Sequence, residues 1–409
     1  MNSRLSVKDN VLILITFFYV AYTIFPLFAD ITGIPAFIPA IFLVVVLYVM
    51  FPKSIIRKSS LFFYCYIGVL FLYVLVDKQF LINGLSPVLS QTYRVMIEAA
   101  WILPTITIVN VLHYKNNPRL YKIIGYGSLM LLVFSFLYIL PLVISSANIL
   151  RVSLGEELAT RPLGLPDYDL MHAYTLILLP LCLCVKKTDT KRRVLYLFLL
   201  LLFGYMIIQT AVTTSLIIMS AVILFAIIFD IRKAPRSVLI LILVLFIGYV
   251  FYQLGFFLMF VESLMPYFED TAVAYKLDDI HTSLLQGQIT GEALTGRMDY
   301  HQMSKDAFLD NPMIGSEISH LGHSKILDML GSMGLLGFTP FLMMIISVMR
   351  SYIVRIKDRE LNSYLYFSFF VSGIFLYTKG IFGAPGFLFT FLLVPSLILS
   401  VKYSNKETH

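Results

Sequence analysis

The sequence predicts an all-α polytopic membrane protein with about twelve transmembrane helices and one large loop outside the membrane. Of its 409 residues, 59% are hydrophobic and 13% are charged, and the mean hydropathy is +0.85. A soluble domain could not cover that much apolar surface. In hydrocarbon every backbone amide must be paired inside the protein, so the apolar segments are expected to be helices. Residues 1–409 are expected to form a single transmembrane domain.

Apolar segments recur along the whole chain, and most of them approach the roughly 20 residues that a helix needs to cross the hydrocarbon core. Their limits are 11–28, 35–51, 60–77, 93–112, 123–143, 170–185, 194–209, 211–229, 238–260, 324–349, 361–380 and 386–401. The longer polar connections are 78–92, 144–169 and 261–323. The last of these, between the ninth and tenth predicted helices, is the largest.

The basic residues indicate the orientation of the chain. Most of the 31 lysine and arginine residues fall in short segments on the side of the membrane that holds the N-terminus. Such an excess is typical of cytoplasmic loops, so both termini are predicted to be cytoplasmic and the loop 261–323 extracytoplasmic. These short loops contain no glycine-rich phosphate loop, which argues against an ATP-driven pump. The positive charge is a signal of topology and does not predict nucleic-acid binding.

The three cysteines, Cys65, Cys182 and Cys184, all fall inside apolar segments. They are interpreted as small core residues, because neither a disulfide framework nor a metal-binding spacing is present among them.

The large outer loop is acidic, and its few bases stand out. A helix is predicted over 296–310, with Thr295 as its cap. Arg297, His301 and Lys305 then follow one another at i, i+4 and i+8, so they form one basic stripe. This stripe is either a solvated face neutralised by neighbouring acids or a cradle for an anion. We favour the cradle for Arg297 and leave both interpretations open for His301 and Lys305.

The outer loop ends at His323, next to the predicted start of the tenth span. A helix N-terminus has free amides and a partial positive charge, which attract phosphate oxygens. His323 titrates near neutrality and could move a proton there, or it could donate one structural hydrogen bond. Glu317 and Ser324 flank it and are candidate substrate contacts. Asp328, one turn further on, could orient a neighbour or cap the helix.

Three glycines follow in the same predicted helix, Gly331, Gly334 and Gly337. Because they recur at every third residue, they predict a close approach of another helix.

A second outer site is predicted just before the sixth span. Arg161 lies in a loop stiffened by proline and glycine, and its planar fork suits phosphate. Asp167 and Asp169 match a weak D-x-D metal pattern, but capping of the sixth span by one of them is the favoured interpretation. His172 is expected in the first turn of that span, near the outer surface. The polar turn 209–215 presents hydroxyls that could bind sugar or bond to backbone carbonyls.

Two strings suggest a family. GR-x3-H-x6-F-x2-NP-x2-G spans 296–315, and GHS at 322–324 is followed by Asp328 and by Gly-Leu-Leu-Gly. Together they resemble the signature region of the O-antigen polymerase and O-antigen ligase superfamily. R-x2-G-x-P-D at 161–167 resembles the first outer arginine motif of that superfamily.

The resemblance implies a GT-C-like glycosyltransferase of the bacterial cytoplasmic (inner) membrane that needs no metal or other cofactor. Its donor would be an oligosaccharide linked to polyprenyl diphosphate, transferred to an acceptor hydroxyl. Carried over to this chain, Arg161 and Arg297 would hold the diphosphate, and His323 would lie near the reaction centre. Further partners would be membrane lipids and a chain-length-regulating membrane protein.

Polymerisation of repeat units into O-antigen or capsular polysaccharide is the expected activity. Ligases often carry an arginine after a Ser or Thr in the turn before the eighth span, and Thr213–Ser215 has none. The alternatives are an O-antigen ligase that transfers the glycan to a lipid A-core acceptor, and a flippase or transporter for the same lipid-linked oligosaccharide.

Overall fold

The computed structural model describes residues 5–25, 27–28, 31, 37–76, 102–145, 168–209, 213–228, 255–267, 277–278, 281–282, 285, 292–316, 324–356, 358–378 and 384–404. These residues are helical almost throughout, and none of them forms a β-strand. The prediction of an all-α fold is therefore confirmed for the described part of the chain.

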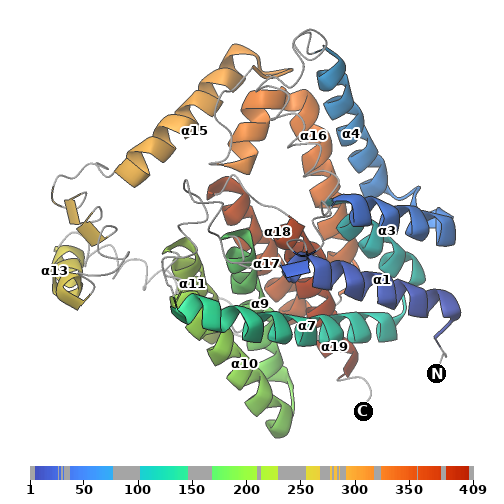
Figure 1. The fold of residues 1–409 in the computed structure, drawn as a ribbon, viewed down its shortest axis with the longest axis horizontal. Helices are drawn as coiled ribbons and strands as arrows, with labels where there is room; N and C mark the ends of the chain where they lie inside the picture. The colour runs from blue at the N-terminus through green and yellow to red at the C-terminus, as the bar shows by residue number, and fades with distance from the viewer. Residues whose placement is uncertain are drawn as a thin grey trace.

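Helices follow one another along the described residues and are connected by short turns or by segments outside them (Figure 1). The N-terminal half contains α1 (Val7–Ile24), α3 (Phe37–Met50), η1 (Pro52–Ser54), α4 (Lys58–Val76), a helix over 102–115, α7 (Pro118–Ser145), α9 (Tyr168–Lys187) and α10 (Thr190–Gln209). The rest contains α11 (Thr213–Ile228), α13 (Phe256–Leu264), η4 (Met265–Tyr267), α15 (Glu292–Asp310), α16 (Lys325–Ile353), α17 (Arg359–Thr378), α18 (Ala384–Leu388), η5 (Phe389–Leu393) and α19 (Val394–Ser404).

Within the described residues, five stretches of helix are long and apolar enough to cross a membrane, which fits a membrane protein. They are Val7–Ile24, Pro118–Leu142, Leu170–Lys187, Lys325–Ile353 and Ala384–Tyr403. Shorter apolar helices occur at Ile38–Met50, Lys58–Tyr73 and Ile218–Ile227. The first and third lie inside predicted spans, and the second begins two residues before the predicted span 60–77. The total of twelve spans, the orientation of the chain and the GT-C-like class stay predictions.

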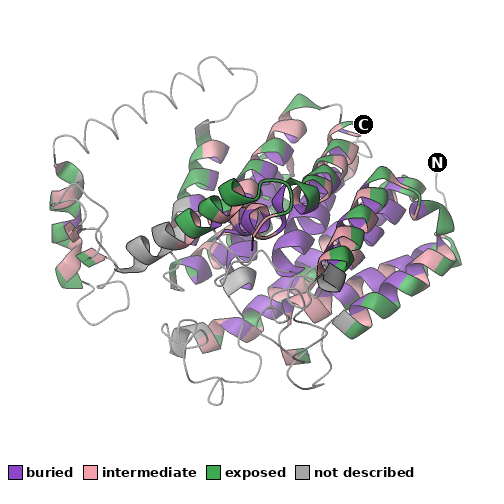
Figure 2. Cartoon of the chain, turned by 90° about the horizontal axis from the view of Figure 1, so that it is seen from above, coloured by how far each residue is buried: buried purple, intermediate pink, exposed green. Residues whose placement is uncertain are grey.

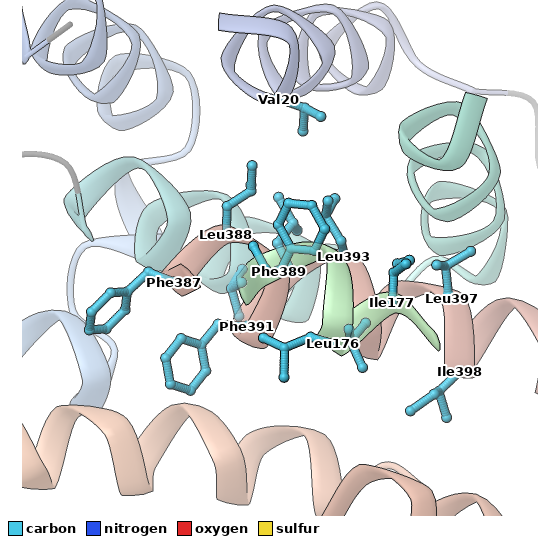
Figure 3. Close-up of a cluster of buried hydrophobic side chains, with 14 of the residues drawn as sticks. Val20, Leu176, Ile177, Phe387, Leu388, Phe389, Phe391, Leu393, Leu397 and Ile398 are labelled. Carbon is cyan, nitrogen blue, oxygen red and sulfur yellow. The ribbon is translucent and has the colours of Figure 1, made fainter. Parts of the chain in front are cut away.

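The last apolar segment forms the centre of the bundle. We call Ala384–Ser404, which comprises α18, η5 and α19, the central rod; every residue of 384–401 is buried, and Lys402 and Tyr403 are partly exposed. It packs against α1, α7, α9 and α17. In the close-up, Val20 of α1 and Ile177 of α9 lie beside the rod (Figure 3). The rod therefore contacts protein on every side, although its composition is that of a lipid-facing helix.

The outer helices have a different surface. Leu14 of α1, Phe42 of α3 and Phe198 of α10 are among many large apolar side chains that are more than half exposed. Figure 2 shows that buried residues concentrate inside the bundle and exposed ones on its outer helices. A soluble protein rarely exposes so much apolar surface, whereas hydrocarbon solvates it without cost.

A π-helical turn interrupts the central rod at Phe389–Leu393. Pro395 has no N–H group and so cannot bond to the carbonyl of Phe391, four residues earlier. Tyr352 of α16 supplies the missing donor, since its Oη donates to the Phe391 carbonyl at 2.7 Å. Both groups are fully buried, so the hydroxyl satisfies an acceptor that no water can reach.

Tyr352→Phe is expected to destabilise the protein by about 1–2 kcal/mol, because it leaves this buried carbonyl without a donor. The measurement is the thermal unfolding temperature of the purified protein in detergent. The matched control is Tyr366→Phe on α17, where the side chain is half exposed. Equal unfolding temperatures for the two variants would contradict the role given to Tyr352.

Candidate functional site

The basic stripe predicted in the outer loop lies on one continuous helix, α15 (Glu292–Asp310). The helix begins before Thr295, so the prediction that Thr295 caps it is wrong. Arg297, His301 and Lys305 nevertheless keep the predicted i, i+4, i+8 spacing, because the backbone is helical through all three positions. Lys305 is exposed, His301 is half buried, and the side chain of Arg297 lies outside the described atoms.

A buried polar contact joins α15 to α16. Ser304 Oγ donates to Asp328 Oδ1 at 3.0 Å, and both side chains are almost fully buried. Figure 1 shows α15 at one edge of the molecule, beside the N-terminal half of α16. This hydrogen bond between Ser304 and Asp328 fixes the basic stripe on α15 relative to the start of α16.

The N-terminus of α16 is capped from within. Ser324 is the N-cap residue, and its Oγ accepts from the Leu327 amide at 3.2 Å. Asp328 Oδ2 in turn accepts from the Ser324 amide at 3.4 Å. Asp328 therefore both caps the helix and orients Ser304, the two roles that the sequence left open. The Ser324 hydroxyl is fully buried in this cap. His323 and Glu317 lie outside the described residues.

Helix α16 is broken at Gly334, whose φ of 57° and ψ of −162° are not helical. The two amides after the break do not bond within the helix. The Leu335 amide donates to the Pro312 carbonyl at 2.9 Å, and the Leu336 amide donates to the Met313 carbonyl at 3.0 Å. The Ser316 amide donates back to the Gly331 carbonyl at 2.8 Å. The turn 311–316 thus replaces the missing helical partners.

Gly331, Gly334 and Gly337 were predicted to allow the close approach of another helix. At Gly334 it is the turn 311–316 that approaches closely. A Cβ atom on Gly334 would lie 2.5 Å from the backbone of Met313, and one on Gly315 would lie 2.4 Å from that of Ser332. Tyr73 of α4 hydrogen-bonds to both segments: its Oη lies 2.6 Å from the carbonyl oxygen of Ile314 in the turn and 3.0 Å from that of Met333 in α16. Three segments far apart in sequence are therefore joined through backbone groups.

His172 marks a second part of the site. Its ring is buried near the start of α9, and its Nδ1 lies 2.7 Å from Ser215 Oγ at the start of α11. Its centroid is 4.9 Å from that of Phe375 on α17. Of the hydroxyls in the turn 209–215, that of Ser215 is therefore paired with a side chain.

The last turns of α17 connect the two parts. His172 contacts Phe375, and the ring of His301 on α15 lies 6.0 Å from that of Tyr377. The structure therefore brings α15 and the starts of α9 and α11 to the same end of α17. Asp169 lies in the first turn of α9, and its side chain is outside the described atoms. Arg161 and Asp167 lie outside the described residues.

Several residues of this region could not be found from the sequence. Tyr73 and Tyr377 lie in apolar spans, and Ser304 is an ordinary polar residue of a helix. No spacing or motif distinguishes them, because their partners are more than 20 positions away. Among the described residues, no group of three or more His, Cys, Asp or Glu side chains could hold a metal ion.

Comparison with models of known families and with curated proteins found no match to this chain.

Gly334→Ala and Gly315→Ala are each expected to destabilise the protein by about 2 kcal/mol or more, because both glycines have positive φ and both face backbone atoms. The matched control is Gly373→Ala in α17, where a Cβ would meet nothing within 4 Å. This control should be neutral or stabilising by up to about 1 kcal/mol. The unfolding temperature of each of the three variants is measured in detergent. Three equal unfolding temperatures would contradict the close packing of the turn 311–316 against the break in α16.

Proposed function

We propose that this chain is an integral membrane glycosyltransferase that joins polyprenyl-diphosphate-linked oligosaccharide units into a surface polysaccharide. The observation that supports it is the arrangement of the motif segments. The helix that bears the Arg297–His301–Lys305 stripe is fixed to α16 by Ser304 and Asp328, at one end of an apolar bundle. A lipid-linked donor needs such a place, where charged groups lie next to helices that are solvated by hydrocarbon.

The reaction proposed is a displacement at the anomeric carbon of the donor sugar. The acceptor hydroxyl forms the new glycosidic bond, the bond to the diphosphate breaks, and the diphosphate leaves with the electron pair. Arg161, Arg297 and the N-terminus of α16 would stabilise the charge that develops on this leaving group. His323 would accept the hydroxyl proton, a step that typically contributes about a hundred- to ten-thousandfold in rate. The glycosyl diphosphate itself supplies the energy.

The remaining candidates would bind the substrate around this centre. His301 and Lys305 extend the basic face of α15, and Asp169 and His172 lie in the first turns of α9. Glu317 and Ser324 flank His323 in the sequence. The hydrogen bond of His172 to Ser215 and its contact with Phe375 fix its ring, so a positioning role is proposed for it.

A transporter of the same lipid-linked glycan is the second candidate, because α16 is interrupted at Gly334. Transporters often build their sites from discontinuous spans whose exposed backbone groups bind substrate or ions. Here the Leu335 and Leu336 amides are already occupied by the carbonyls of Pro312 and Met313. The break therefore serves to anchor the turn 311–316, and this argues for the enzyme. An O-antigen ligase would share the donor chemistry and differ in its acceptor.

Arg161→Ala and Arg297→Ala are each expected to lower the rate of chain elongation by about a hundredfold or more. Each removes a positive charge that would stabilise the negative charge developing on the leaving diphosphate. The purified protein is supplied with lipid-linked repeat units, and the ladder of products is read on a gel. Lys276→Ala, which removes a base from the same outer loop, is the control and should leave the ladder unchanged. Elongation at the normal rate by either folded arginine variant would refute the diphosphate clamp. Vesicle transport of the substrate with no ladder would favour the transporter.

The side of the membrane is tested separately by labelling single cysteines in cells. Lys305→Cys on α15 should react with an impermeant maleimide added outside the cytoplasmic membrane. Arg350→Cys, at the other end of α16, should react only after the membrane is opened. The reverse pattern would contradict the predicted orientation and, with it, an extracytoplasmic active site.

A further inference from the structure

The row of side chains that forms the basic stripe of α15 becomes apolar at the C-terminal end of the helix. Leu309 follows Lys305 by four residues, so it is the next neighbour in the row of Arg297, His301 and Lys305. It lies about 6 Å beyond Lys305 along the helix axis. Its side chain is 69% exposed, although contact between leucine and water is unfavourable. The row therefore passes from basic residues to an uncovered apolar side chain.

The turn after α15 extends this apolar surface. Met313 and Ile314 are both more than half exposed. The amide–carbonyl bonds that dock the turn into the break of α16 place it beside Leu335 and Leu336, two further exposed apolar residues. We call Leu309, Met313, Ile314, Leu335 and Leu336 the junction patch. Its side chains come from two helices and the turn between them, and the packed core uses none of them.

The length of α16 indicates the level of the junction patch in the membrane. The part of α16 after the break, 335–353, is about 28 Å long, close to the roughly 30 Å thickness of the hydrocarbon core. It is long enough to cross the membrane alone, so the break lies near one boundary of the hydrocarbon. Further along α16, Leu342, Met343 and Ile346 are also exposed. The junction patch thus connects the lipid-facing surface of α16 to the basic stripe.

This order of surfaces matches an amphiphile with an anionic head and a long hydrocarbon chain. Inside the bilayer such a chain is already solvated by hydrocarbon, so contact with apolar side chains there gains little. The boundary is different, because a head group that is bound at the stripe lifts the first units of its chain towards water. An apolar surface at that level covers these units and removes their area from water.

We infer that the junction patch binds the first isoprene units of the polyprenyl chain of a donor whose diphosphate is held at the basic stripe. This inference rests on the proposed function, which supplies the donor. It assigns residues that recognise the lipid part of the substrate, apart from those that contact the diphosphate or the sugar. It also gives the bonds of Tyr73 and of the break in α16 a role, since they fix Met313 and Ile314 before the donor binds.

The test measures the binding of two probes to the full-length protein in neutral detergent by isothermal titration calorimetry. Farnesyl diphosphate carries a short isoprenoid chain on the diphosphate, and inorganic diphosphate carries none. Farnesyl diphosphate should bind about tenfold to a hundredfold more tightly than inorganic diphosphate, because only its chain covers apolar surface of the patch. Equal affinities for the two probes would refute the inference.

Single substitutions locate the contribution of the chain. Ile314→Asn should weaken the binding of farnesyl diphosphate by about threefold to tenfold and leave the binding of inorganic diphosphate unchanged. Leu309→Asn on α15 should have the same effect, so the conclusion does not depend on the folding of one variant. Lys305→Ala should weaken both probes by the same factor. The matched control is Ile38→Asn at the start of α3, where the side chain is 50% exposed, against 54% for Ile314. It should leave both affinities unchanged.

The outcomes separate the junction patch from the proposed transfer reaction. If Ile314→Asn and Leu309→Asn bind farnesyl diphosphate like Ile38→Asn, the patch is refuted, and binding of inorganic diphosphate would leave the diphosphate site in place. Normal binding of both probes without a product ladder would refute the transferase and not the patch. Lysophosphatidate tests for membrane lipids. If it binds as tightly as farnesyl diphosphate and is weakened equally by Ile314→Asn, the patch takes acyl chains and the isoprenoid assignment is wrong.

Discussion

The pairing of backbone groups without water is the constraint on which this structure depends. A long apolar helix satisfies its own amides and carbonyls, but this chain interrupts its helices at Gly334 and at Pro395. At each interruption a group from another segment completes the hydrogen bonding. The turn 311–316 serves α16, and Tyr352 serves the central rod. These hydrogen bonds join segments that are separated in sequence. The same bonds that satisfy the backbone therefore also fix the tertiary arrangement.

The position of the polar helix α15 is a consequence of this pairing. α15 could not be held against an apolar bundle by its own basic stripe, because charges gain little from contact with hydrocarbon. It is held by the turn that follows it, which enters the break in α16, and by the buried bond between Ser304 and Asp328. His301 is thereby brought to the end of α17, where His172 also lies. A substrate site in which the groups are positioned before binding requires such rigid support.

The two ends of α16 hold charge in different ways. At the N-terminal end, a serine and an aspartate close the helix, and the basic residues belong to the neighbouring α15. At the C-terminal end, Arg355 donates to the carbonyls of Ser351 and His113 and so caps two helices.

The sequence by itself determined the helical class, the positions of the apolar helices and the local features of the outer loop. Composition and the need to pair amides require helices, and the i, i+4, i+8 spacing follows from helical geometry. These are local properties, so Arg297, His301 and Lys305 do share one helix. The cap residues were not determined in this way, since Thr295 lies inside α15 and Ser324, predicted as a substrate contact, caps α16.

Only the tertiary structure decided which apolar helix is central. Lipid and the protein interior are equally apolar, so hydropathy does not distinguish a lipid-facing helix from a helix surrounded by protein. Thus Ala384–Tyr403 has the composition of any other span, yet every residue of 384–401 is buried. The partners of Gly334, Tyr73 and Tyr352 were also beyond the sequence, since each contact joins backbone atoms that carry no residue-specific signal. Long-range hydrogen bonds to carbonyls are set by packing, and packing is a property of the folded chain.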